Sequence, residues 1–363
     1  MANNNFLEYL INPLELLKTK KVLQVNPTVI PERTENVSGK IYLYEYDSEN
    51  ISYSELNKIE DTYKHLDTSL TSWINIDGIN RVEVERICTH FDIHPLIVED
   101  ILSIGQRPKM DDINGVLFCV LNMLFFNEQT ETVESEQISI VLGKNFIISI
   151  QEDATRDVFN GLREKIKINN SKLRQLHADF LFYMLIDSIV DHYFLVMEKL
   201  GEKIEQLEED IVKQATNRTL VKINSLRKEM IILKRSIGPV RELINGILKS
   251  ENELIEEKTE KYFKDVYDHI IQANDLAENY RDMLINIHDL YVSNVNLKLN
   301  ESMKVMAIVT CLLAPATVIG GIFGMNFEAI PMLHNKWGFF ISVGIMLIIP
   351  IWMIRYFRRK KWF

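Results

Sequence analysis

The chain has 363 residues, 47% of them hydrophobic and 25% charged, and a formal net charge of −10 at pH 7. This length suffices for one folded soluble domain with a helical extension. The acidic balance excludes nucleic acid as a favoured partner, because phosphate binding requires clustered Lys and Arg. The average composition conceals a difference along the chain: residues 1–302 are polar and rich in acids, whereas 303–357 are strongly apolar.

The three cysteines, Cys88, Cys119 and Cys311, lie far apart and lack the spacing of metal ligands. We interpret them as buried small residues of a protein in a reducing compartment. Residues 1–10 do not combine a basic stretch with a long apolar core, so no signal peptide is expected.

Residues 1–40 are poorly patterned, and from there to about residue 152 short runs of β-forming residues alternate with helical patterns. Strands are expected over 41–47, 72–76, 115–126, 136–142 and 145–151. Helices are expected over 82–91 and 95–104, and after residue 153 over 155–168, 172–212 and 216–248. Gly238-Pro239 is expected to bend the last of these. The pattern predicts an α/β domain with a mixed sheet.

A single very long helix is expected from Glu253 to Phe323, because this stretch has no proline before Pro315 and no glycine before Gly320. About 70 residues at a rise of ~1.5 Å each give a rod of about 100 Å. Such a length is typical of a stalk that enters a bilayer.

The stalk carries two opposite faces at alternating steps of three and four residues. The polar face, called here the acidic seam, contains Asp265, Asp268, Gln272, Asp275, Asn279, Asp282, Asn286, Asp289, Ser293, Asn296 and Asn300. The opposite apolar seam contains Phe263, Val266, Ile270, Ala273, Ala277, Tyr280, Leu284, Ile287 and Tyr291. This sustained period of 3.5 indicates contacts with neighbouring helices. An acidic face in bulk water is the alternative.

The acidic seam continues into the apolar segment, mostly as small or hydroxyl-bearing residues: Met303, Ala307, Thr310, Ala314, Thr317, Gly321 and Gly324. A stripe that stays polar or small through a bilayer lines a helix contact or a pore. We favour an aqueous cation pore.

Two uncharged runs, 305–323 and 338–354, are expected to cross the membrane rather than to be buried core helices. A hydrocarbon core of ~30 Å needs about 20 apolar residues. The tail behind the second run is basic, with Arg355, Arg358, Arg359, Lys360 and Lys361. The positive-inside preference places the tail, and with it the N-terminal domain, in the cytoplasm. Since one subunit with two spans cannot enclose a pore, oligomerisation is expected.

The tripeptide Gly324-Met325-Asn326 at the end of the first span resembles the signature of the CorA-type magnesium/cobalt channel family. Residues 94–101, 106–109 and 262–269 and the basic C-terminus also resemble that family. The likeness covers the chain from about residue 40.

The resemblance implies an α+β membrane protein that forms a homopentameric funnel in the cell membrane, with both termini cytoplasmic. It divides the chain into a cytosolic αβα domain with a mixed sheet and bracing helices, a stalk helix, a pore-lining first span, an extracellular Gly-Met-Asn loop, a second span and a basic tail. The corresponding ranges are 1–252, 253–302, 303–323, 324–337, 338–357 and 358–363.

The implied activity is passive import of Mg²⁺, with Co²⁺ and Ni²⁺ as poorer substrates, without enzymatic activity or an organic cofactor. Asn326 would ring the entrance and bind a hydrated ion, since Mg²⁺ dehydrates reluctantly and prefers oxygen ligands. The resemblance also places residues on the pore: Asn300, Met303, Met306, Thr317 and Gly321, to which the seam adds Thr310 and Ala314. Met303 and Met306 would form the apolar constriction.

A regulatory Mg²⁺ is implied between Asp289 of one subunit and Asp100 of the next, with Glu99 and Asp265 contributing a second site. Facing carboxylates repel by about 1 kcal/mol at 4 Å in water. Bound Mg²⁺ would offset this repulsion, so cytosolic Mg²⁺ is expected to close the channel.

The sequence departs from the family pattern at two positions. Met332 stands in the outer loop where members often carry an acid, although Glu328 remains, and Ala314 stands where a methionine is frequent. Two alternatives stay open: a zinc transporter of the same superfamily, and a membrane-anchored signalling or scaffold protein. Zinc would favour nitrogen and sulfur ligands, which do not cluster near the pore in this sequence.

Overall fold

The computed structural model describes residues 40–65, 69–153, 156–169, 171–250, 252–326, 330–332, 335–360 and 362. The chain forms two compact units. The first unit contains the chain up to Glu208 together with Leu220–Asn286, and the second contains Glu209–Thr219 and Ile287–Phe363.

A mixed seven-stranded sheet forms the centre of the first unit, in the order β2-β1-β3-β7-β6-β5-β4. The strands are β1 (Lys40–Tyr46), β2 (Ile51–Leu56), β3 (Thr71–Asp77), β4 (Lys109–Ile113), β5 (Val116–Asn127), β6 (Thr132–Leu142) and β7 (Phe146–Gln151). Only the β3–β7 pair is parallel among the described strands. The predicted mixed sheet is therefore confirmed.

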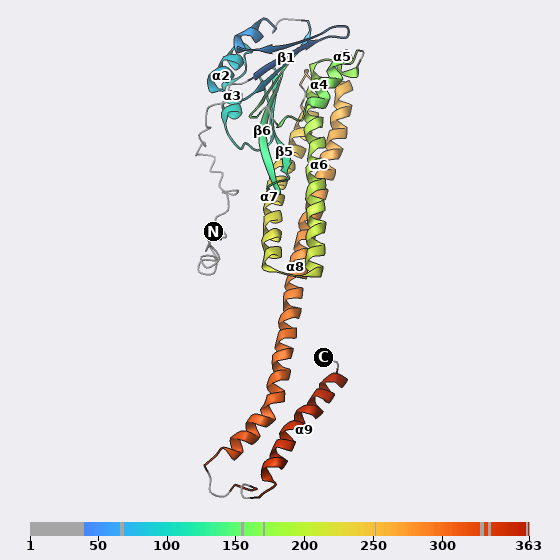
Figure 1. Ribbon diagram of the computed structural model, residues 1–363. Coiled ribbons are helices and arrows are strands. Elements are labelled where there is room, and N and C mark those ends of the chain that lie inside the picture. The colour runs from blue at the N-terminus through green and yellow to red at the C-terminus, as the bar shows by residue number, and fades with distance from the viewer. Residues whose placement is uncertain are drawn as a thin grey trace. The chain divides into compact units, whose positions relative to one another are not determined.

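Helices cover both faces of this sheet (Figure 1). On one face, α2 (Arg81–His90) and α3 (Pro95–Leu102) pack on a core that includes Ile74, Ile148 and Phe118. On the other face lies α6 (Ala178–Lys213), whose Tyr193 Oη donates a 2.7 Å hydrogen bond to the main-chain oxygen of Asn122 on β5. This arrangement is the expected αβα sandwich.

The remaining helices are η2 (Ile59–His65), a 3₁₀ helix, α4 (Asn160–Lys167), α5 (Lys172–Gln175), α7 (Asn217–Lys249), α8 (Glu257–Phe323) and α9 (Gly338–Arg359). The 67-residue α8 is continuous through Pro315 and across residues 302 and 303. Within the first unit α8 approaches α6 closely, because a Cβ atom at Gly201 would lie 2.5 Å from Tyr280 Oη. Glycine at this position therefore sets the spacing of the two helices.

Several predicted elements differ from the observed ones. The expected helix 155–168 begins only at Asn160, and the expected helix 172–212 is divided into α5 and α6. The edge strands β2 and β4 were not predicted. Cys88 and Cys119 are buried as expected, whereas Cys311 is exposed, because its apolar helix has little cover within a single chain.

Candidate cation path and metal centre

The two faces of α8 are as different in the structure as in the sequence. All eleven residues of the acidic seam, from Asp265 to Asn300, are exposed. Every residue of the apolar seam is buried except Tyr280, which is half-buried. Burial of the apolar seam stabilises α8 against the rest of its own chain, while the acidic seam is left for solvent, ions or another copy.

Within the part of the chain that the structure describes, three helices are long and apolar enough to span a membrane: α6, α8 and α9. In α6 the most apolar window is 61% buried inside the fold, whereas the corresponding windows of α8 and α9 are 6% buried. The core of the sandwich therefore accounts for the apolar character of α6. The apolar ends of α8 and α9 are uncovered and require lipid or other subunits.

The predicted pore residues lie on the exposed C-terminal part of α8. Met303 and Met306 are 69% and 70% exposed. The hydroxyl groups of Thr310 and Thr317 donate to the main-chain oxygens of Met306 and Leu313, at 2.9 and 3.1 Å. These bonds satisfy the hydroxyl protons within the helix and leave oxygen lone pairs free. Asn300, Ala314 and Gly321 are also exposed.

The Gly-Met-Asn tripeptide follows the last turn of α8 directly. Gly324 and Met325 donate their main-chain N–H groups to the carbonyl oxygens of Gly320 and Ile322, at 3.0 and 3.3 Å. Asn326 lies beyond the helix and is exposed. Its amide can therefore bind a ligand at the helix end.

Most of the basic cluster at the end of α9 lies within the described residues. Arg355, Arg358 and Arg359 form the end of α9, and Lys360 caps it. Lys361 and the outer-loop Glu328 lie outside the described residues.

Asp100, the predicted regulatory ligand, lies near the end of α3 and already has two side-chain partners. Lys109 Nζ lies 2.6 Å from its Oδ2 atom, and Gln106 Nε2 donates to Oδ1 at 3.1 Å. Asp289 belongs to the second unit, where its carboxylate is exposed and lies 3.5 Å from His288 Nδ1. Their pairing between subunits stays a prediction.

A cluster of possible metal ligands joins α6 to α8 in the first unit. The ligand atoms of Asp187, Asp191 and His269 all lie within 4.8 Å of one another. Asp191 is exposed, and the other two are half-buried. Of the described residues, only these three form such a group, so neither Glu99 nor Asp265 belongs to it.

The electrostatics of this cluster favour a cation. Burial raises the pKa of Asp187, and the negative charges of Asp191 and Asp265 raise it further. Tyr183 Oη donates to Asp187 Oδ2 at 3.2 Å. A carboxyl whose pKa is raised in this way would be stabilised in its charged form by a bound divalent cation.

The donor set suits a divalent metal ion. Two carboxylates provide the oxygen ligands that Mg²⁺ prefers, and the imidazole adds a nitrogen that suits Co²⁺, Ni²⁺ and Zn²⁺ better. This group was not predicted from the sequence, although a signal was present. Asp187 and Asp191 are four residues apart on α6, and Asp265 and His269 are four residues apart on α8, so each pair shares a helix face.

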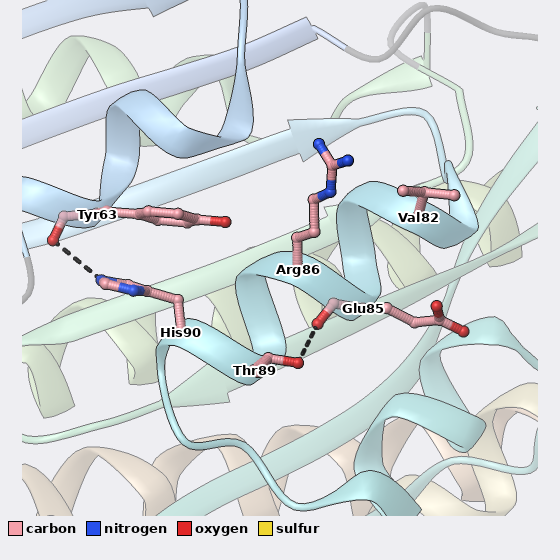
Figure 2. A pocket seen from close by; sticks show the side chains of 6 residues that line it. All are labelled: Tyr63, Val82, Glu85, Arg86, Thr89 and His90. Atoms are coloured by element: carbon pink, nitrogen blue, oxygen red, sulfur yellow. Dashed lines mark hydrogen bonds between the residues drawn. The ribbon is translucent and has the colours of Figure 1, made fainter.

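A separate surface pocket of about 650 Å³ lies over η2 and α2. Figure 2 shows its lining residues: Tyr63, Val82, Glu85, Arg86, Thr89 and His90. Tyr63 and His90 stack on each other at 3.9 Å between ring centroids, and Arg86 forms a 2.6 Å ion pair with Glu60. The rings and the guanidinium are therefore engaged within the protein, and the pocket contains none of the predicted site residues.

The fold and the uncovered apolar helices define a membrane protein with a large αβα domain. The chain belongs to the CorA-like Mg²⁺ transporter protein family, whose model matches residues 69–359. The predicted family is therefore confirmed.

Individual relatives agree with this assignment. The chain is 38% identical to the cobalt/magnesium transport protein CorA of Thermotoga maritima over 341 residues, which cover 92% of this chain and 97% of that protein. The fold is similar to the complete CorA magnesium transporter of Methanocaldococcus jannaschii, with a TM-score of 0.72, 21% identity and coverage of 91% and 100%. The cytoplasmic domain of ZntB from Vibrio parahaemolyticus is similar with a TM-score of 0.56, 15% identity and coverage of 72% and 99%. The likeness to the complete CorA structure confirms the predicted fold class.

Proposed function

We propose that this chain is the subunit of a homopentameric channel that imports Mg²⁺ passively across the cell membrane, with Co²⁺ and Ni²⁺ as further substrates. One observation carries the proposal most strongly. A single helix, α8, presents an exposed acidic seam and then continues as an uncovered apolar segment to Gly324-Met325-Asn326. The name of the Thermotoga maritima relative, a cobalt/magnesium transport protein, supports Mg²⁺ and Co²⁺ as substrates.

The path for the ion runs along the seam in this proposal. Copies of α8 surround the pore, Asn326 binds the hydrated ion at the outer mouth, and Met303 and Met306 form the apolar constriction. The basic end of α9 lies on the cytoplasmic side, as do both termini. A neutral amide selects Mg²⁺ through its water shell without holding it as tightly as a carboxylate would.

Cytosolic Mg²⁺ closes this channel by binding to acidic groups outside the membrane. Asp289 of one subunit and Asp100 of the next hold one ion, and Glu99 and Asp265 contribute to a second. The cluster of Asp187, Asp191 and His269 is a further place for a divalent cation, because its ligand atoms all lie within 4.8 Å of one another.

Ion flux into liposomes tests the proposal. Purified full-length protein is reconstituted, and Mg²⁺, Co²⁺ and Zn²⁺ are compared alone and in competition. Asn326→Ala is expected to lower Mg²⁺ flux and weaken its selectivity, whereas Asn335→Ala, which removes another exposed amide of the same loop, should preserve both. Wild-type flux and selectivity in the Asn326→Ala variant would reject the entrance assignment.

Zinc transport is the second candidate. His269 provides a nitrogen ligand in the acidic cluster, and the ZntB cytoplasmic domain shares the fold. The competition experiment distinguishes the two, because a zinc transporter would keep its Zn²⁺ flux in excess Mg²⁺. A protein that only anchors a signalling domain would conduct none of the three ions.

A further inference from the structure

Lys109 forms an ion pair with Asp100, whose carboxylate is expected to bind the regulatory cation. Its Nζ atom lies 2.6 Å from Asp100 Oδ2 and 3.1 Å from Asp111 Oδ2. The side chain of Asp100 is only 17% exposed, so this ion pair is partly shielded from water. Lys109 is the first residue of β4, and Asp111 lies two residues further along the same strand.

The pair is held in place by a network of amide side chains. Gln106 Nε2 donates to Asp100 Oδ1 at 3.1 Å, so each carboxylate oxygen of Asp100 has a donor. Gln137, a buried residue of β6, donates through Nε2 to the main-chain oxygen of Asp100 at 3.3 Å and accepts from the Gln106 N–H at 3.2 Å. These bonds fix α3 and the start of β4 relative to each other, and the ammonium group is preorganised against Asp100.

A carboxylate neutralised in this way is a weaker ligand for a divalent cation. The cation must displace the ammonium from Oδ2, and the displaced ammonium can stay on Asp111. The apparent affinity is then the intrinsic affinity multiplied by the fraction of Asp100 that is free of Lys109.

We propose that Lys109 is a built-in competitor of the regulatory divalent cation: it neutralises Asp100 when the site is empty, and it leaves Asp100 and stays paired with Asp111 alone when the cation binds. This inference rests on the proposed function, in which Asp100 is a ligand of that cation. Lys109 thereby sets the cytosolic Mg²⁺ concentration at which the channel closes. An unpaired, partly buried carboxylate at Asp100 would destabilise the domain, and the ion pair with Lys109 prevents this when no cation is bound.

The inference is tested on the full-length protein in detergent by titrating Mg²⁺ and following the thermal unfolding midpoint. Lys109→Gln removes the competitor, so the half-saturating Mg²⁺ concentration should fall by about threefold or more, as expected from the strength of a partly exposed ion pair. Lys109→Met keeps the aliphatic stem and replaces Lys109→Gln if that variant does not fold. In liposomes, closure by internal Mg²⁺ should shift in the same direction.

Lys203→Gln is the matched control. Lys203 lies on α6 in an ion pair with Glu131, and its side chain is 30% exposed compared with 37% for Lys109. Both substitutions remove one positive charge from the same unit. A general effect of net charge would therefore lower the half-saturating Mg²⁺ concentration equally in both variants. An unchanged or higher half-saturating Mg²⁺ concentration in the Lys109 variant, or an equal fall in Lys203→Gln, would overturn the inference.

A double-mutant cycle separates this inference from the proposed function. Asp100→Asn should weaken the Mg²⁺ response, and in that background Lys109→Gln should have no further effect on it. If Asp100→Asn leaves the response unchanged, the regulatory role of Asp100 in the proposed function is wrong. If Asp100→Asn weakens the response but Lys109→Gln does not strengthen it, only the competitor role of Lys109 is wrong.

Discussion

Glu136 is a buried acid on β6 whose protonation should couple the stability of the αβα domain to pH. Burial raises its pKa to about 7, although its Oε1 atom accepts the main-chain N–H groups of Glu152 and Asp153 at 2.8 and 2.7 Å. The folded state therefore holds a proton that the unfolded state loses at lower pH. Stability is expected to fall as pH rises from the ordinary value of 4.5 to about 7, and to change little above that.

Glu136→Gln should remove this loss of stability at higher pH, because glutamine keeps the accepting oxygen and cannot ionise. At about pH 8 the variant should be more stable than wild type by roughly 1–3 kcal/mol, and at about pH 4 the two should be similar. Unfolding midpoints of the full-length protein across this range provide the measurement. Glu128→Gln, at the exposed turn between β5 and β6, is the control, and an equal gain there would contradict the explanation.

His269 gives the acidic cluster its only nitrogen ligand among the described residues, so it should determine which ions bind there. His269→Ala is expected to weaken Co²⁺ and Ni²⁺ binding by about tenfold and Mg²⁺ binding by less, since imidazole suits the first two ions better. Isothermal titration of the full-length protein measures this difference. His192→Ala is the control, because His192 lies on α6 outside the cluster and packs against Phe125 of β5. An equal loss for all three ions would contradict a coordinating role.

Among the elements, α8 was the most predictable and the edge strands were the least. The period of the two seams depends on residue types alone, and it recurs over enough turns to exclude a chance pattern. By contrast, β2 and β4 lie at the edges of the sheet, and each is a short segment of low apolar content that carries acids such as Glu55, Asp111 and Asp112. Their pairing comes from β1 and β5, whose positions no local pattern reveals.

The candidate sites also differ in how far local sequence reveals them. The apolar runs and the Gly-Met-Asn tripeptide are continuous in sequence, so they could be found directly. The cluster of Asp187, Asp191 and His269 depends on how α6 lies against α8, which the sequence does not specify. The ion pair of Asp100 with Lys109 likewise depends on the approach of β4 to the end of α3.

The contact between α6 and α8 can be tested at Gly201. A Cβ atom there would lie 2.5 Å from Tyr280 Oη and 3.0 Å from its Cζ atom, so the ring or the helix must move. Gly201→Val should therefore destabilise the protein by about 1–3 kcal/mol, and the added change Tyr280→Leu should recover part of that loss. Thermal unfolding of the full-length variants provides the measurement.

Gly161 on α4 provides the matched control for this contact. No atom lies within 4 Å of a Cβ placed there, among the described residues, and alanine favours a helix over glycine. Gly161→Ala should be neutral or slightly stabilising, whereas Gly201→Ala should destabilise. Equal effects of the two alanine substitutions would show that helix propensity, and not the approach of α6 to α8, sets the result.

At the scale of the whole molecule, a single chain leaves its most apolar surfaces and its acidic seam uncovered. The large apolar side chains on the C-terminal part of α8 and on α9 are mostly exposed, which no soluble monomer tolerates. The seam carries five aspartates that repel one another unless cations or other subunits intervene. Assembly in a bilayer around a cation path would resolve both problems, as the proposed function requires.

The predicted closure by cytosolic Mg²⁺ depends on the whole assembly, because its cation site requires residues of two subunits. Asp289→Asn removes one ligand charge without supplying a replacement cation, so the internal Mg²⁺ concentration that halves the flux should rise by about tenfold or more. Asp282→Asn is the control, since it removes an equal charge from the same seam seven residues earlier. Flux into liposomes loaded with graded Mg²⁺ gives both values. Equal shifts in the two variants would indicate a general effect of seam charge, and no shift in Asp289→Asn would exclude its role as a regulatory ligand.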